Sequence, residues 1–174
     1  MKTILVFVST LDGKVTKWDD PHVRKWSSES DQVYFSGIWK NSRLIVTGSS
    51  TFDADPVKPS PDHLLVVMTR RPSDYKKYEV PGQIEFTDMT PVQLASRFEK
   101  EGYQQMVVAG GPHIATSFFK ERLVDELWLT IEPMIFGAGA SIVAAERLDI
   151  NLKLISCEKV SDRGTMITKY SVLK

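Results

Sequence analysis

A glycine pair at the end of an apolar run is the first feature of this chain that could do chemistry. Gly110 and Gly111 follow the run Met106–Ala109, and Pro112 then begins a helical pattern. Glycine lets a ligand approach the backbone closely, and the free amides at the start of a helix bind anions. The arrangement predicts a pyrophosphate site; a tight strand-to-helix turn that binds nothing is the alternative. The residues expected at this site are Gly110, Gly111, Pro112, His113 and Ile114.

A second strand-to-helix turn repeats this geometry. Val46 ends an apolar run and is followed by a glycine among hydroxyl residues, before a short helical pattern. The hydroxyls and amides of such a turn can hold a phosphate or a ribose, and ordinary N-capping by serine or threonine is the alternative. The expected ligand contacts are Thr47, Gly48, Ser49 and Thr51.

Two arginines come directly after the predicted strand that runs from His63 to Thr69. Thr69 is followed directly by Arg70 and Arg71. Ligands of open α/β sheets bind outside the carboxyl ends of the strands, and two guanidiniums beside a hydroxyl suit a phosphate monoester. Thr69, Arg70 and Arg71 therefore favour the 2′-phosphate of NADP over NAD. A solvated surface pair, which contributes little, is the alternative.

Short β-branched runs alternate with helical patterns along the chain, and this alternation is typical of an α/β sheet. The pattern predicts one domain over residues 1–174, with helices flanking a mixed, mostly parallel sheet and a closing antiparallel hairpin. A strong helix start is predicted at Thr90, which precedes Pro91 and Gln93. The expected strands are 3–9, 43–47, 63–69, 83–86, 104–109, 124–131, 152–160 and 165–173. The expected helices run from 27 or 28 to about 40, from 90 to 102 and from 112 to about 121, with a helical turn at 48–52.

Composition places the chain among ordinary globular domains. It has 174 residues, 42% of them hydrophobic and 25% charged, with zero formal net charge, so no overall charge attracts nucleic acid or an anionic membrane. Cys157 is the only cysteine, which excludes an intramolecular disulfide and fits a reducing compartment. No apolar run is long enough to cross a bilayer. We therefore expect a cytoplasmic protein that binds a small molecule, without a nucleic-acid partner, a membrane partner or a metal.

Six ordered motifs cover nearly the whole chain: Ser9–Lys14, Thr47–Thr51, Gly110–Pro112, Leu123–Leu127, Glu132-Pro133 and Gly137–Gly139. Together they resemble the C-terminal reductase domain family of bifunctional riboflavin-biosynthesis proteins, which shares the dihydrofolate reductase fold. The resemblance implies that NADPH lies across the carboxyl ends of the strands, with its pyrophosphate at Gly110 and Gly111. It also implies reduction of a ribosylaminopyrimidine phosphate, of the 5-amino-6-(5-phosphoribosylamino)uracil type, at its ribose carbon.

Asp31 is the catalytic candidate that the resemblance indicates. In dihydrofolate reductase a carboxylate early on the first helix binds the pterin ring, and Asp31 falls at about the corresponding distance before Thr47. Such a carboxylate can hold a heterocycle and assist its protonation. The alternative is that Asp31 only forms a capping box with Ser28. The expected substrate contacts are Ser9, Asp12, Trp18 and Asp31, and for Asp12 the alternative is that it only shapes the turn at Gly13.

One segment departs from the family pattern. The riboflavin enzymes carry Asp-Asn-Pro and a following Arg after the second strand, where this chain has Asp55-Pro56 and no Arg within Phe52–Pro59. Three functions stay open: a pyrimidine reductase, a dihydrofolate or pteridine reductase, and a non-catalytic NADP-binding protein of the same fold. A flat apolar pocket at Asp31 without a cation for a substrate phosphate would favour the pterin substrate.

The C-terminal hairpin predicts an assembly. Its two strands, 152–160 and 165–173, are rich in apolar residues and are expected at the edge of the sheet. Exposed edges are usually covered or paired, and a homodimer is the commonest closed assembly. Members of the family that the chain resembles often dimerise, so we expect a homodimer.

Overall fold

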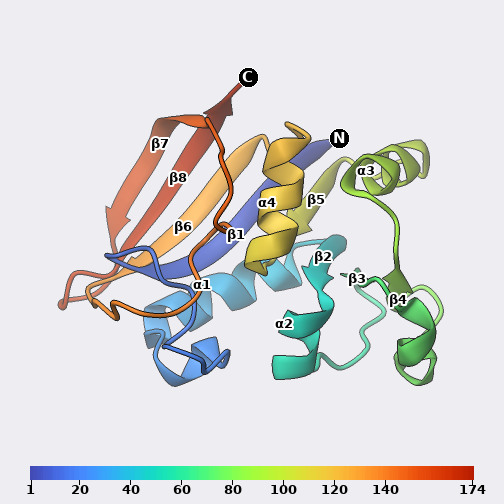
Figure 1. The fold of residues 1–174 in the computed structure, drawn as a ribbon, viewed down its shortest axis with the longest axis horizontal. Coiled ribbons are helices and arrows are strands. Elements are labelled where there is room, and N and C mark those ends of the chain that lie inside the picture. Colours follow the sequence, from blue (N-terminus) through green and yellow to red (C-terminus); the bar gives the residue numbers. More distant parts are fainter.

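The computed structural model describes all residues, 1–174, as a sheet between two layers of helices (Figure 1). Eight strands form one sheet in the order β4-β3-β2-β5-β1-β6-β8-β7. The strands are β1 (Lys2–Thr10), β2 (Leu44–Gly48), β3 (Leu64–Met68), β4 (Ile84–Thr87), β5 (Gln105–Val108), β6 (Glu126–Glu132), β7 (Asn151–Lys159) and β8 (Met166–Leu173). The helices are α1 (Glu29–Lys40), α2 (Ser49–Ala54), α3 (Pro91–Lys100) and α4 (Pro112–Lys120), with 3-10 helices η1 (Val23–Lys25) and η2 (Pro72–Tyr78).

The sheet is mixed, as predicted. Strands β1 to β6 run parallel to one another, whereas β8 is antiparallel to both β6 and β7. The first strand of the chain is central, because β1 pairs with β5 on one side and with β6 on the other. The carboxyl ends of six strands therefore meet at one edge of the sheet, where a ligand of an α/β fold is expected.

Apolar residues on both faces of the strands hold the helices in place. Every residue of β2 and β3 is buried, which fits their nearly uninterrupted apolar sequences. On one face, α3 and α4 pack Leu94, Phe98 and Phe118 against the largest cluster of buried side chains. On the other face, α1 packs Phe35 against a smaller cluster of β1 and β5 residues, and α2 contributes Phe52.

Helix starts follow the predicted capping signals. Thr90 and Gln93 form both bonds of a capping box at α3. Ser28 caps α1, and its Oγ accepts from the amide of Asp31 at 3.2 Å. The 3-10 helix η2 was not predicted, because its local sequence carries no helical period. Stacking of Tyr75 on Phe86, with ring centroids 4.8 Å apart, stabilises it through tertiary contact.

The C-terminal hairpin forms the far edge of the sheet, as expected (Figure 1). All nine residues of β7 are exposed, and a bulge interrupts its pairing with β8 between Leu154 and Ser156. No helix in the structure has the length and apolar character that crossing a membrane requires.

Candidate functional site

Three glycines, Gly48, Gly110 and Gly111, allow chain segments to approach closely at the carboxyl ends of β2 and β5. A Cβ added to Gly111 would lie 3.2 Å from Thr51 Oγ1, and one added to Gly48 would lie 2.9 Å from Ile114 Cγ1. Gly110 has φ of +83°, a conformation that side chains rarely adopt, and its added Cβ would lie 3.4 Å from Phe7. The Gly110–Gly111 peptide bond is cis. The glycine pair therefore forms a backbone surface between β1, α2 and α4.

The start of α4 presents amides that no protein group satisfies. Gly111 is its N-cap and provides no side-chain acceptor, and Pro112 has no N–H to bond. The amides of His113 and Ile114 donate no hydrogen bond. The first backbone bond of α4 runs from the amide of Ala115 to the carbonyl of Gly111, at 3.0 Å. Uncapped first-turn amides form an anion site. The pyrophosphate predicted at this turn thus has a backbone cradle, within a helix of nine residues.

Thr47 supports the glycine pair instead of facing outward. Its side chain is 4% exposed, and its Oγ1 lies 3.3 Å from Ala109 O and 3.4 Å from Gly110 O. The hydroxyl therefore donates across from β2 to the carbonyls that precede the turn. Ser49 is half-buried and Thr51 exposed at the start of α2, and the Thr51 hydroxyl lies beside the open side of both glycines.

The two arginines after β3 have different surroundings. Met68 is in register with Gly48, so the chain leaves β3 at Thr69 at the same level as α2 begins. Arg71 Nε lies 3.4 Å from Asp74, and its amide donates to Thr69 Oγ1 at 3.3 Å. Arg70 is exposed and takes part in none of the ion pairs of the chain. Arg70 is thus the free cation of the pair.

Asp31 is buried at the start of α1, with 6% of its side chain exposed. Its amide completes one bond of the N-cap, but its carboxylate does not make the reciprocal bond of a capping box. The amide of Ser28 donates instead to Glu132 Oε1 at 2.8 Å. The capping-box alternative for the Asp31 side chain is therefore not what the geometry shows.

The surroundings of Asp31 favour its protonated form. Burial raises the pKa of the Asp31 carboxyl, and the nearby charge of Glu132 raises it further, although the hydroxyls of Thr130 and Ser27 oppose this. The Ser27 hydroxyl has no hydrogen-bond partner in the structure, so its opposing effect is weak. Burial and the charge of Asp31 also raise the pKa of Tyr34 to about 12.

Three buried polar atoms of residues 26–34, the segment that contains Asp31, lack partners. They are Trp26 Nε1, Ser27 Oγ and Tyr34 OH. A buried polar group without a hydrogen bond costs about 1–3 kcal/mol, so such groups are rare in native proteins. Three such groups are therefore concentrated in residues 26–34, which also carry the buried Asp31.

The other predicted substrate contacts lie along the β1 edge and the loop after it. Ser9 is 2% exposed, and its Oγ donates to Thr10 O at 3.1 Å. The Asp12 carboxylate accepts from Gly137 N at 2.8 Å and Phe136 N at 3.2 Å, and a hydrogen bond from Thr10 lowers its pKa. Both side chains are thus engaged in the protein, which supports the turn-shaping alternative for Asp12. Trp18 is 59% exposed in the loop.

The glycine cradle and the Asp31 region share strand β1. Phe7 of β1 lies at the glycine pair, and Thr10 is in register with Glu132. β1 lies between β5, which leads into the glycine pair, and β6, which ends at Glu132, so the two regions lie on either side of the same strand. Sequence reasoning did not select Phe7, and it included Glu132 in a motif of the family without assigning it a role at the site; a glutamate at the end of an apolar strand is the signal that could have indicated that role.

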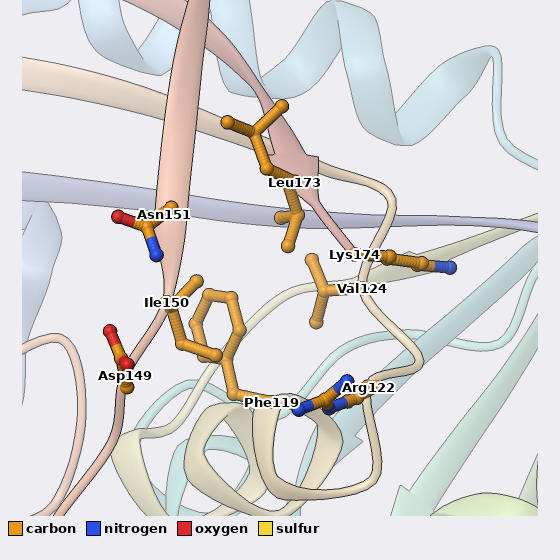
Figure 2. A pocket seen from close by; sticks show the side chains of 9 residues that line it. Phe119, Arg122, Val124, Asp149, Ile150, Asn151, Leu173 and Lys174 are labelled. Carbon is orange, nitrogen blue, oxygen red and sulfur yellow. The ribbon is translucent and has the colours of Figure 1, made fainter.

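A separate pocket of about 390 Å³ lies at the other end of the strands, away from the carboxyl ends of β1 to β6 (Figure 2). Phe119, Val124 and Ile150 line its apolar wall, and Arg122 and Lys174 lie at its rim. Val124 precedes β6, so the pocket is at the amino end of that strand, whereas Glu132 is at the carboxyl end. None of the predicted site residues lines it.

The mixed sheet, with helices on both faces and a closing antiparallel hairpin, defines a dihydrofolate-reductase-like fold. The chain belongs to the RibD C-terminal domain family, whose model matches residues 1–166. It is 27% identical over 144 residues to the uncharacterized protein YwjB of Bacillus subtilis (strain 168), covering 79% of this chain and 80% of YwjB. These relationships support a reductase of the RibD type.

Solved structures share the fold at low sequence identity. One is the diaminohydroxyphosphoribosylaminopyrimidine deaminase/5-amino-6-(5-phosphoribosylamino)uracil reductase of Thermotoga maritima, with a TM-score of 0.76, 16% identity, and coverage of 98% of this chain and 56% of that one. Another is dihydrofolate reductase from Enterococcus faecalis, complexed with NADP(H) and RAB-propyl. Its TM-score is 0.66 and its identity 14%, with coverage of 99% of this chain and 97% of that one.

Proposed function

We propose that this protein is an NADPH-dependent reductase of a ribosylaminopyrimidine of the 5-amino-6-(5-phosphoribosylamino)uracil type. The observation that carries the proposal is the placement of two complementary regions on either side of β1. One is a backbone cradle with free amides at the start of α4. The other is a buried, uncapped carboxyl group at Asp31. A dinucleotide and a heterocycle bound at these places would be neighbours.

The residues of the cradle fit NADPH. The amides of His113 and Ile114 would hold the pyrophosphate, since they have no protein acceptor, and Gly111 leaves room that a Cβ would fill. Arg70 would bind the 2′-phosphate through a charge-assisted hydrogen bond. NADPH, when bound, supplies the hydride of the reaction.

Asp31 would hold the substrate heterocycle and move a proton at its carboxyl oxygen. A raised pKa keeps more of this carboxyl protonated near neutral pH than an exposed aspartate. The unpartnered Trp26 Nε1 and Tyr34 OH would orient the ring. Trp26, Ser27 and Asp31 are buried, so little water reaches these groups, which strengthens their polar contacts.

Lys17 favours a phosphorylated substrate over a pterin. Its Nζ lies 5.2 Å from the Trp18 ring centroid and 5.8 Å from that of Phe136, and the Phe136 ring contacts Trp26 at 5.2 Å between centroids. Lys17 belongs to no ion pair. It would therefore provide the cationic end that a substrate phosphate needs.

A dihydrofolate or pteridine reductase is the second candidate. The Asp31 carboxyl group favours it, because the group is not used in the helix cap and can pair with the amino-substituted edge of a pterin. The two substrates differ in their need for Lys17. A Lys17→Ala variant should lose turnover of the phosphorylated pyrimidine and retain that of dihydrofolate.

The experiment that tests the proposal is an NADPH oxidation assay with both substrates, together with fluorescence titration of NADPH and NADH. We expect tighter binding of NADPH and turnover of the ribosylaminopyrimidine phosphate. Turnover of dihydrofolate alone would select the second candidate. Binding of NADPH with no turnover of either substrate would favour a non-catalytic protein of this fold, and equal affinities for both dinucleotides would contradict the role of Arg70.

A further inference from the structure

Glu132 is a buried carboxylate that the proposed chemistry does not use. It ends β6 and is 1% exposed. Its Oε1 accepts from Ser28 N at 2.8 Å, and its Oε2 accepts from Thr165 Oγ1 at 2.8 Å. Neither Glu132 nor Asp31 forms an ion pair in the chain. Burying a carboxylate without a cation is costly, so its position calls for a physical reason.

The reason becomes apparent from a comparison of the two capped helices. At α3 the N-cap Thr90 and the third residue Gln93 exchange both bonds of a capping box. At α1 the third residue is Asp31, and only its amide takes part. The bond that the Asp31 side chain would make is supplied by Glu132 from 104 positions along the chain. A distant carboxylate has replaced the local one.

We infer that Glu132 is a positioning residue, which occupies the N-cap of α1 and thereby keeps the Asp31 carboxyl free for the substrate. If Glu132 were absent, the amide of Ser28 would be an unsatisfied donor next to Asp31, and the local capping box would form. The role of Asp31 toward substrate rests on the proposed function, but the exchange of capping partners does not.

The charges that face Asp31 support the inference. On its own helix it faces the neutral Tyr34. From β6 it faces Thr130 and the charge of Glu132, and Ser27 precedes the helix. Glu132 thus acts on Asp31 in two ways, by removing it from the cap and by disfavouring its ionised form.

The test is a pH titration of the Asp31 side-chain carbon by ¹³C NMR, with assignment from Asp31→Asn, in wild type, Glu132→Gln and Glu132→Ala. Glutamine keeps an oxygen for Ser28 N and removes the charge, so Asp31 should titrate at lower pH. Alanine frees Ser28 N, so the Asp31 carboxyl should enter the cap and its titration should move lower still. Glu126→Gln, which neutralises another carboxylate of β6, is the matched control and should leave the titration unchanged.

Activity provides the second readout. Turnover should fall at least tenfold in Glu132→Ala with NADPH affinity unchanged, and Glu132→Gln should restore most of it with a pH profile moved toward acid. An Asp31 titration that is the same in wild type and Glu132→Gln would overturn the inference, and this comparison stands even if Glu132→Ala does not fold. A moved titration combined with full turnover in Asp31→Asn would instead defeat the proposed function and leave the inference intact.

Discussion

Asp31 is a side chain whose burial works against the stability of this fold. It is almost fully enclosed and has no cationic partner, and three polar atoms of the same segment, residues 26–34, also lack partners. Active sites often keep such unfavourable groups because their chemistry needs them. Two predictions follow from the same carboxyl group, one for turnover and one for stability.

Replacement of Asp31 by asparagine should lower turnover at least tenfold, because the amide cannot donate the proton of a carboxyl group. This corresponds to about 1.4 kcal/mol of transition-state stabilisation. Steady-state kinetics on the ribosylaminopyrimidine substrate, with NADPH affinity as the control, measures it. Unchanged turnover would mean that Asp31 has no part in the reaction.

The same Asp31→Asn variant should be more stable than wild type at neutral pH, by about 1 kcal/mol. Burial raises the pKa of Asp31 above its ordinary value of 3.8, so the folded protein binds the proton more tightly than the unfolded chain. The free energy of unfolding of wild type therefore falls as pH rises from the ordinary pKa of aspartate to the raised pKa of the folded protein. Urea denaturation at several pH values should show a gain from Asn at pH 7 that disappears in acid. A gain independent of pH would contradict the assignment.

Arg70 and Arg71 form a matched pair for testing the cofactor. Arg70→Ala should weaken NADPH binding by about 1–3 kcal/mol, the usual contribution of a hydrogen bond to a charged group, and should leave NADH binding nearly unchanged. Arg71→Ala should have a smaller effect, because Asp74 already pairs with it. Fluorescence titration decides between them, and an equal loss for NADH would exclude contact with the 2′-phosphate.

At the scale of elements, the site depends on how strands end and helices begin. β5 ends at the glycine pair, and α4 begins there without a capping side chain. α1 begins beside the carboxyl end of β6, where Glu132 supplies its cap. Each helix thus presents its amino end to the same edge of the sheet, which suits an anionic cofactor beside a heterocycle.

Gly111→Val should abolish NADPH binding while the fold survives. The backbone of Gly111 has φ of −89°, which valine can adopt, and its Cβ would lie 3.2 Å from Thr51 Oγ1, within the cradle. Gly37→Val is the control, since a Cβ there meets nothing within 4 Å. Calorimetric titration measures binding, and circular dichroism measures the fold. Wild-type affinity in Gly111→Val would show that the glycine pair only makes a turn.

At the scale of the whole molecule, the C-terminal hairpin leaves an apolar face exposed. Leu152 and Leu154 are 40% and 52% exposed, and they are in register with Val172 and Tyr170 of β8, which pack on the main core. The exposed leucines therefore continue the face of the sheet that α3 and α4 cover elsewhere. We expect a second copy of the chain to cover this face in a homodimer.

Light scattering at micromolar concentration tests the assembly. Wild type should have twice the 19.7 kDa mass of the chain, and Leu154→Glu should have the mass of one chain, because a carboxylate cannot be buried at the interface. Val92→Glu, on exposed α3, is the control and should remain dimeric. A wild-type protein with the mass of one chain would contradict the expectation.

The amino-acid sequence by itself determined the elements and the places where they end. The buried strands β2 and β3 were predictable from their apolar runs, and the capping box at Thr90 from three neighbouring residues. The turn at Gly110-Gly111-Pro112 was predicted in the same way. These features depend on hydrogen bonds and turns among residues a few positions apart, so a local sequence pattern is enough to predict them.

Only the tertiary structure decided which groups meet. The central place of β1, the bond from Ser28 to Glu132, and the bonds that hold Asp12 to the loop at Gly137 join residues far apart in the chain. Packing of the sheet selects such contacts, because many distant partners could satisfy the same donor or acceptor equally well. For this reason the sequence could not distinguish whether the Asp31 side chain caps its own helix, and the answer depended on a glutamate more than a hundred residues away.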